Sequence, residues 1–331
     1  MASGRIKIIP TREIKSVLLK NLKIAVIGYG SQGKAQALNL RDSGFMPIIG
    51  LPSKSRSRKI AKKDGFTVAT PAKATRNSDL ISILIPDHKH KELFNNELCR
   101  VIKKDQVFIF AHSLSVHFKL VKQPKDVDFI LVAPHSPGIR LREKYLSGEG
   151  VLAFIGQTEA SSKKSLNIAA AYAKAIGCAR KGVIATTFAE EAIGDIFGEQ
   201  AVLCGGLSAL LKAGFDTLIE AGLPPQNAYI ECVYQLDLIV DLIKKYGIAG
   251  MYDKISATAA FGSFQAEDMI INKKSKSAMN LIMKKVKAGK FADELLDDYS
   301  NSFKKLKAYK KEKRHPNLDK MALFFTKRFD N

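Results

Sequence analysis

The sequence predicts an α/β Rossmann-type dinucleotide-binding domain followed by an all-α C-terminal domain. Three features lead to this prediction. Short apolar runs alternate with helical patterns up to about residue 185, a glycine-rich turn follows the first strong run, and almost only helical patterns come afterwards. Strands that alternate with helices indicate a parallel sheet covered by helices on both faces. We therefore expect a first domain at 1–185 and a second at 186–331.

The expected strands are short runs rich in Ile, Val and Phe. They are KIAVIG (23–28), PIIGL (47–51), DLISILIP (79–86), VFIFAHS (107–113), DFILVAP (128–134) and GVLAFIGQ (150–157), and a helical pattern follows at 161–177. In the second domain we expect helices at 187–212, 225–246, 256–271, 275–288 and 290–299, then a basic linker at 304–316 and a last short helix.

Charge limits the classes of partner. The chain has 331 residues and a formal net charge of +21, which would suit a nucleic acid or another anionic partner. Its Lys and Arg residues are nevertheless spread through 54–63 and 273–314, with no Gly-Arg repeats and no finger motif. A solvated basic surface is the favoured interpretation, and no nucleic-acid partner is expected.

Cysteine usage and hydropathy bear on the compartment. Cys99, Cys178, Cys204 and Cys232 have no CxxC spacing and lie in apolar or helical contexts, which suits buried, reduced thiols in a cytoplasmic protein. No secretory signal is evident, and no uninterrupted apolar run approaches the roughly 20 residues of a membrane span. The sequence therefore predicts a cytoplasmic protein without membrane contact.

A dinucleotide site is expected at the turn after the first buried strand. Gly28, Gly30 and Gly33 form G-x-G-x-x-G between a strand and a helix. The glycines allow a tight turn, close approach of backbone to a pyrophosphate and close helix–strand packing. In this context a cofactor turn is favoured over an incidental glycine turn. The intervening Tyr29, Ser31 and Gln32 belong to the expected cofactor contacts.

The loop after the second strand predicts the cofactor type. An NAD site usually carries an acidic residue there for the ribose hydroxyls, whereas residues 50–59, GLPSKSRSRK, contain none. Ser55, Arg56, Ser57 and Arg58 offer hydroxyls and guanidinium groups that suit a 2′-phosphate. NADPH is therefore favoured over NADH, and a generic basic loop is the alternative.

Acidic residues gather where basic residues are absent. Lys212 is the only Lys or Arg between 182 and 242, and Glu191, Asp195 and Glu199 recur every fourth residue, on one helix face. Glu231 and Gln235 have the same spacing. Carboxylates in apolar surroundings need positive compensation, and oxygen ligands favour Mg²⁺. A solvated acidic face is the alternative. Mg²⁺ beside a nicotinamide suggests a carbonyl as the hydride acceptor.

Several segments together resemble ketol-acid reductoisomerase in its short form. They are KIAVIGYGSQGKAQALNLRDSG, FAHSLSVHF, VAPHSPG, DIFGEQAVLCGGL and 228–262, so the likeness runs from about residue 20 to His315-Pro316. The resemblance implies Mg²⁺-dependent alkyl migration in 2-acetolactate or 2-aceto-2-hydroxybutyrate, then reduction with NADPH, on the path to valine and isoleucine. It also implies a knotted helical domain, an exception to the usual topology, and a homodimer or higher homo-oligomer.

The resemblance implies roles for matching residues. Asp195 would bridge two Mg²⁺ ions, Glu199 would complete the first site, and Glu231 with Gln235 would belong to the second, reached from the partner subunit. Glu191 would help to hold water in the metal cluster, and Ser256 would bind the substrate carboxylate. His112 and His135 occupy positions of active-site residues. Further expected cofactor contacts are Pro86, Asp87 and Gly138.

The chain also departs from the family pattern. His135 stands where the family has Lys, and Gln235 where it has Glu, so the second metal site carries less fixed charge. Ser113 replaces Gly, Ala260 replaces Glu and Pro52 replaces Arg. Three hypotheses follow. They are a working reductoisomerase, a divergent paralogue that only reduces a 2-keto acid, and a non-catalytic basic binding protein on the same fold.

Overall fold

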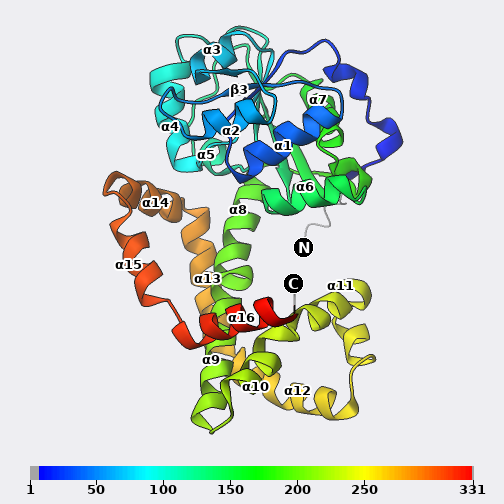
Figure 1. Ribbon diagram of the computed structural model, residues 1–331, viewed down its shortest axis with the longest axis vertical. Helices are drawn as coiled ribbons and strands as arrows, with labels where there is room; N and C mark the ends of the chain where they lie inside the picture. Colours follow the sequence, from blue (N-terminus) through cyan, green and yellow to red (C-terminus); the bar gives the residue numbers. More distant parts are fainter. Residues whose placement is uncertain (1–6, 330–331) are drawn as a thin grey trace. The chain divides into compact units, whose positions relative to one another are not determined.

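The computed structural model describes residues 7–329, which form two compact units. The first unit ends at Ala192 and the second begins at Ile193, within helix α8 (Phe188–Gly198). The first unit is a mixed α/β structure and the second is helical (Figure 1). This confirms the expected fold class, while the boundary at 185/186 and the knot stay predictions.

The first unit is built on one sheet, whose nine strands in the described residues have the order β1-β9-β8-β7-β6-β5-β2-β3-β4. The six strands from β4 to β7 run parallel, in the doubly wound order that reverses between β2 and β5. The strand bounds are β1 Lys7–Ile9, β2 Ile24–Ile27, β3 Ile48–Gly50, β4 Val68–Ala69, β5 Leu80–Ile83, β6 Val107–Phe110, β7 Asp128–Pro134, β8 Leu152–Gln157 and β9 Gly182–Ala185.

Helices cover both faces of this sheet because successive strand residues point to opposite sides. In β2, Ile24 and Val26 belong to the apolar cluster that contains α1 and α7, whereas Ala25 and Ile27 belong to the cluster on the other face. The helix bounds of this unit are α1 Ser31–Asp42, α2 Ser57–Lys63, α3 Pro71–Arg76, α4 His90–Glu92, α5 Leu114–His117, α6 Gly138–Leu146 and α7 Ser165–Ala175.

The second unit has a small core of its own. Phe215, Ala228, Tyr229, Met321 and Phe325 are its buried apolar residues, and Tyr229 stacks on Phe325 with ring centroids 4.9 Å apart. The remaining helix bounds are α9 Gly205–Glu220, α10 Pro225–Tyr229, α11 Leu236–Tyr252, α12 Ala257–Ile270, α13 Lys273–Lys287, α14 Lys290–Ser300, α15 Lys304–Glu312 and α16 Pro316–Phe329.

The expected basic linker at 304–316 is wrong for most of its length, because α15 occupies Lys304–Glu312. The carboxylate of Asp298 accepts hydrogen bonds from the backbone N–H groups of Lys305 and Leu306, at 2.7 and 2.9 Å. This caps the helix N-terminus, where free N–H groups need acceptors and negative charge is favourable.

One expectation about burial needs correction, and one helix bears on the expectation of no membrane span. Cys178 is buried and Cys232 half-buried, but Cys99 and Cys204 are exposed, so the expected burial of these two thiols is wrong within the single chain. One helical stretch of the described residues, Phe188–Glu220, is long and apolar enough to cross a membrane by length and composition. That is weak support for a span, because helices of soluble proteins pass the same test.

Candidate active site

The expected cofactor residues of the first unit lie at the carboxyl ends of the parallel strands. A cavity of about 320 Å³ opens where the strand order reverses, and Gly30, Pro86 and His112 line it from the segments after β2, β5 and β6. Ser31, Gln32, Asp87, His90 and Pro134 also line it. Ligands of open α/β sheets bind at this edge and this reversal point.

The glycine-rich turn fits tightly against the sheet. Gly28 has φ +105°, and a Cβ at this position would lie 2.5 Å from the carbonyl oxygen of Leu84. A Cβ on Gly33 would lie 2.4 Å from the carbonyl oxygen of Gly28, whereas one on Gly30 would meet nothing within 4 Å. Gly28 and Gly33 therefore allow close packing, and Gly30 leaves open space in front of the turn. Tyr29 is buried and donates its hydroxyl hydrogen to Asp64, at 2.9 Å.

Two helix N-termini meet beside this turn. Gly138 begins α6, and a Cβ on it would lie 2.3 Å from the carbonyl oxygen of Ser31, which begins α1. The amide of Gln32 donates to the carbonyl oxygen of Ser136 at 2.7 Å, which ties the two segments together. Helix N-termini carry free N–H groups and partial positive charge, so this pair suits the phosphates of a dinucleotide.

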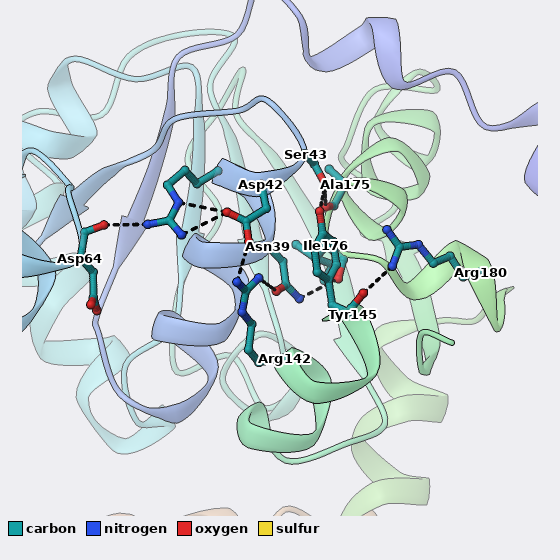
Figure 2. A network of polar contacts seen from close by, with 10 residues as sticks. Asn39, Asp42, Ser43, Asp64, Arg142, Tyr145, Ala175, Ile176 and Arg180 are labelled. Carbon is teal, nitrogen blue, oxygen red and sulfur yellow. Dashed lines mark hydrogen bonds and ion pairs between the residues drawn. The ribbon is translucent and has the colours of Figure 1, made fainter. Parts of the chain in front are cut away.

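A polar network fixes α6 against α1 and α7 (Figure 2). The Arg142 guanidinium donates to Asn39 Oδ1 at 2.8 Å and to Asp42 Oδ2 at 2.5 Å, and the amide of the fully buried Asn39 donates to the Ile176 carbonyl oxygen at 3.0 Å. At the far end of α6, the hydroxyls of Tyr145 and Ser43 lie 2.7 Å apart. The two helices are therefore held along their length, with their N-termini together.

Replacing Arg142 with methionine is expected to lower the free energy of unfolding by about 2 kcal/mol, because the buried Asn39 oxygen loses its donor. Urea unfolding followed by circular dichroism measures this change. Arg140→Met is the matched control on the same helix. Its ion pair with Glu143 is exposed, so a change within about 0.5 kcal/mol is expected. Equal losses for the two variants would contradict the role of the network.

A second cavity, of about 380 Å³, lies beyond the glycine turn. Pro52, Ser55 and Ser57 line it from the loop after β3, and Lys89, Glu92 and Glu97 line it from the segment after β5. Arg56 and Arg58 are not among its lining residues. Arg58 donates to the backbone carbonyl oxygens of Leu51 at 2.7 Å and Ala69 at 3.1 Å, so its guanidinium is engaged with the ends of β3 and β4.

His112 follows β6 and has a carboxylate on one side. Its Nδ1 lies 3.6 Å from Asp87 Oδ2, and the side chain of His112 is about a quarter exposed, at 24%. The next residue, Ser113, donates its backbone N–H to Glu191 Oε2 at 2.9 Å, and Glu191 is only 3% exposed. The contact brings the first carboxylate of the acidic helix face to the edge of the cofactor sheet.

His135 follows β7, at the same edge of the sheet. Its ring lies edge-on against Phe154, with centroids 4.4 Å apart, and its backbone N–H donates to the Leu152 carbonyl oxygen at 2.9 Å. The residue is exposed and is not among the residues that line the cavity of His112. The structure therefore brings Glu191 to the residue after His112 and places His135 against β8.

Two of the expected metal ligands, Glu199 and Glu231, lie in π-helical turns, whereas Asp195 lies in α8. Glu199 begins the turn Glu199–Leu203 between α8 and α9, and Glu231 lies in the turn Ile230–Tyr234 before α11. The Gln235 amide donates to Glu231 Oε2 at 2.9 Å. Wide turns of this kind occur often at functional sites. The pair Gly205-Gly206 is the sequence feature that could have indicated the turn Glu199–Leu203. A Cβ on either glycine would lie about 2.1–2.2 Å from a backbone carbonyl oxygen of that turn.

The expected metal ligands of the described residues do not form a cluster of three. Among residues 7–329, no group of three or more His, Cys, Asp or Glu side chains lies close enough together to hold an ion. Asp195 is half-buried and Glu199, one turn later, is exposed. Mg²⁺ usually takes one or two carboxylates and keeps several waters, so this pair suits it without a third ligand from the same chain.

Ser256 caps the N-terminus of α12. Its hydroxyl oxygen accepts the backbone N–H of Ala259 at 3.1 Å, which leaves the hydroxyl hydrogen for another acceptor. A role in holding a substrate carboxylate stays a prediction for this residue. Lys89, His90 and the Asp87–His112 contact are features that the sequence reasoning missed. Asp87, Lys89 and His90 follow Pro86 directly, in the segment P-D-H-K-H.

Comparison with known proteins finds matching family models over both units. Residues 18–182 match the family model described as "Acetohydroxy acid isomeroreductase, NADPH-binding domain", and 188–322 match "Ketol-acid reductoisomerase, C-terminal domain". A solved NADH-preferring ketol-acid reductoisomerase from an uncultured archean is 36% identical, with a TM-score of 0.92 over 98% of this chain and 100% of that one.

More distant structures share the fold alone. A semialdehyde dehydrogenase NAD-binding protein from Cupriavidus necator has a TM-score of 0.63 at 15% identity, over 81% of this chain and 99% of that one. A 1-pyrroline-5-carboxylate reductase from Streptococcus pyogenes has a TM-score of 0.55 at 18% identity, over 81% and 98%.

Proposed function

Because the chain belongs to the ketol-acid reductoisomerase family, we propose that it converts 2-acetolactate and 2-aceto-2-hydroxybutyrate with NADPH and two Mg²⁺ ions. As a family member it is an NAD(P)-dependent enzyme of branched-chain amino-acid biosynthesis. One observation supports this reaction most. The hydrogen bond from Ser113 to the buried Glu191 joins the start of the acidic helix face to the cofactor sheet, beside His112.

The residues divide the work as follows. The turn Gly28–Gly33 and the N-termini of α1 and α6 would hold the cofactor phosphates, and the cavity at His112 would hold the nicotinamide. Asp195 and Glu199, with Glu231 and Gln235 from a partner subunit, would hold Mg²⁺, which polarises a bound carbonyl as a Lewis acid. His112 would hold or release a proton at its Nε2, the ring nitrogen away from Asp87. Ser256 would donate to the substrate carboxylate.

Purified protein tests this function directly. Incubation with 2-acetolactate, Mg²⁺ and NADPH should consume NADPH, and omission of Mg²⁺ should stop it. No consumption at any Mg²⁺ concentration would contradict the proposal.

The cofactor preference is proposed from the second cavity. Ser55 and Ser57 line it and offer hydroxyls, and Lys89 is the one lining cation among the described residues. In this proposal Lys89 therefore takes the place that the sequence suggested for the guanidinium groups of Arg56 and Arg58. A charged donor close to a 2′-phosphate would favour binding of NADPH. The carboxylates of Glu92 and Glu97 line the same cavity and would act in the opposite direction, by repelling the phosphate.

Replacing Lys89 with alanine is expected to raise the KM for NADPH about tenfold, since loss of one charge-assisted hydrogen bond is worth roughly 1.4 kcal/mol. The KM for NADH should change less than twofold. Lys91→Ala is the control, because Lys91 is exposed on the same segment and is not among the lining residues of this cavity. An equal effect on both cofactors would argue against recognition of the 2′-phosphate by Lys89.

A dimer is proposed as the active form. Apolar side chains on the helices of the second unit are exposed in the single chain, including Leu238, Ile248, Phe261 and Met269 at 62–78%. In the most apolar 18-residue stretch of Phe188–Glu220, only 6% of the residues are buried. Exposed apolar surface of this extent marks an interaction site. Sedimentation of the purified protein at several concentrations tests whether a second copy covers it.

A reductase without isomerase activity is the second candidate. The observation that favours it is the contact from the Gln235 amide to Glu231, since an uncharged ligand position weakens the second metal site. This candidate predicts reduction of 3-hydroxy-3-methyl-2-oxobutanoate without turnover of 2-acetolactate. Comparable rates on the two substrates would exclude it.

A further inference from the structure

His112 shares its carboxylate neighbour with a second histidine. Asp87 follows β5 and begins the 3₁₀ turn Asp87–Lys89. Its Oδ2 lies 3.6 Å from Nδ1 of His112, and its Oδ1 lies 3.9 Å from Nδ1 of His90. The three side chains line one side of the cavity at the carboxyl edge of the sheet.

The surroundings of His90 favour its neutral form. Its Nε2 lies 3.0 Å from the carbonyl oxygen of Ile85, which can only accept, so Nε2 carries the hydrogen. Its Nδ1 lies 2.7 Å from the hydroxyl of Ser115, which can donate. Burial is the main cause that lowers the pKa of His90. A neutral His90 leaves the negative charge of Asp87 directed at His112.

Other charged groups also lie near His112 in the sequence and the fold. Glu191 of α8 accepts the backbone N–H of Ser113, the residue after His112, at its Oε2. His88 and Lys89 share the 3₁₀ turn with Asp87, and Lys89 is exposed. Asp87 forms an ion pair with the His112 ring, with Oδ2 3.6 Å from Nδ1.

We propose that Asp87 is the positioning residue of His112, holding the imidazole with Nδ1 protonated and turned toward β5. The proposal rests on the proposed function only in giving His112 a part in the reaction. A carboxylate that holds one ring nitrogen fixes the tautomer and favours the protonated ring, as in other carboxylate–histidine pairs. Asp87 then acts through His112 rather than through the cofactor, to which sequence reasoning assigned it.

The sign of the pH effect follows from the pair. Burial alone would raise the pKa of Asp87, but the contact with His112 holds it below its usual value. The same interaction favours the protonated form of His112. Without the carboxylate, His112 loses its proton at a lower pH. The rate of any step that needs the protonated ring then falls at a lower pH as well.

Asp87→Asn tests the proposal, with Asp87→Glu as the conservative variant and Asp105→Asn as an exposed control. The titration of the six histidines, assigned by single His→Gln variants, is followed by NMR in each protein. We expect the His112 midpoint to move to lower pH in Asp87→Asn and kcat to fall about 10- to 100-fold, with the KM for NADPH within about twofold. Asp87→Glu should restore part of both, and Asp105→Asn should change neither.

Other outcomes overturn the proposal. An unchanged His112 midpoint, or a raised KM for NADPH with unchanged kcat, would make Asp87 a cofactor contact or a structural residue. If the wild-type protein turns over neither substrate, the proposed function fails, but the NMR titration still decides whether Asp87 holds His112.

Discussion

Replacing Asp195 with asparagine is expected to lower kcat/KM for 2-acetolactate about a thousandfold, while the affinity for NADPH stays within about twofold of the wild type. Asparagine keeps the shape of the side chain but removes the charge that would be shared by two Mg²⁺ ions. A thousandfold loss corresponds to about 4 kcal/mol of transition-state stabilisation, which is the scale of a metal acting as a Lewis acid. Steady-state kinetics and cofactor fluorescence measure the two quantities.

Thermal unfolding separates this effect from misfolding. Mg²⁺ that binds the native state raises the melting temperature, so this increase should disappear in Asp195→Asn while the metal-free protein unfolds at an unchanged or higher temperature. Glu220→Gln removes an exposed carboxylate at the end of α9 and should keep both activity and the response to Mg²⁺. Full activity in Asp195→Asn would contradict a metal role for this helix face.

Replacing Gly33 with alanine is expected to lower the free energy of unfolding by about 3 kcal/mol. The added Cβ would lie 2.4 Å from the carbonyl oxygen of Gly28, so α1 would have to move away from the turn. The atom in the way belongs to the backbone of Gly28, which cannot move aside as the end of a flexible side chain could. Cofactor affinity should fall as well, because the N-terminus of α1 loses its position. Urea unfolding and cofactor titration measure the two changes.

Gly30→Ala is the matched control in the same turn. A Cβ on Gly30 would meet no protein atom within 4 Å, and its φ of −82° suits alanine. Stability should therefore stay within about 0.5 kcal/mol, while cofactor affinity falls, because the Cβ would stand in the space in front of the turn. If both variants destabilised the protein equally, the close approach at Gly33 would not be the cause.

The parallel part of the sheet could be predicted from local pattern. Each of the expected runs contains a strand, because parallel strands are buried on both faces and appear as continuous apolar segments. Strands β1, β4 and β9 were missed. Val68–Ala69 has only two residues, and Lys7–Ile9 gains its place by antiparallel pairing with Gly182–Ala185 far along the chain. Pairing over such a separation leaves little trace in local composition.

The sequence predicted which residues belong to the site better than it predicted which of them contact one another. The glycine turn and His112 lie at the expected strand ends, because motif and strand are adjacent in sequence. The contacts between Ser113 and Glu191, and between Asp87 and His112, join segments that only the sheet order brings together. Arg58 has contacts that its charge alone did not indicate. Its guanidinium donates to backbone carbonyl oxygens at the ends of two strands, and its role toward a phosphate stays a prediction.

The network of Arg142 with α1 has a consequence for how fast a dinucleotide is captured. Because Asn39 and Asp42 hold α6 in place before any ligand arrives, the two helices need no closing motion around a pyrophosphate. The rate of encounter is then set by diffusion and by the long-range attraction between a strongly basic chain and a polyanion, not by a slow conformational step. Dissolved salt would screen this attraction, so it would slow the binding of the dinucleotide without changing the arrangement of α1 and α6.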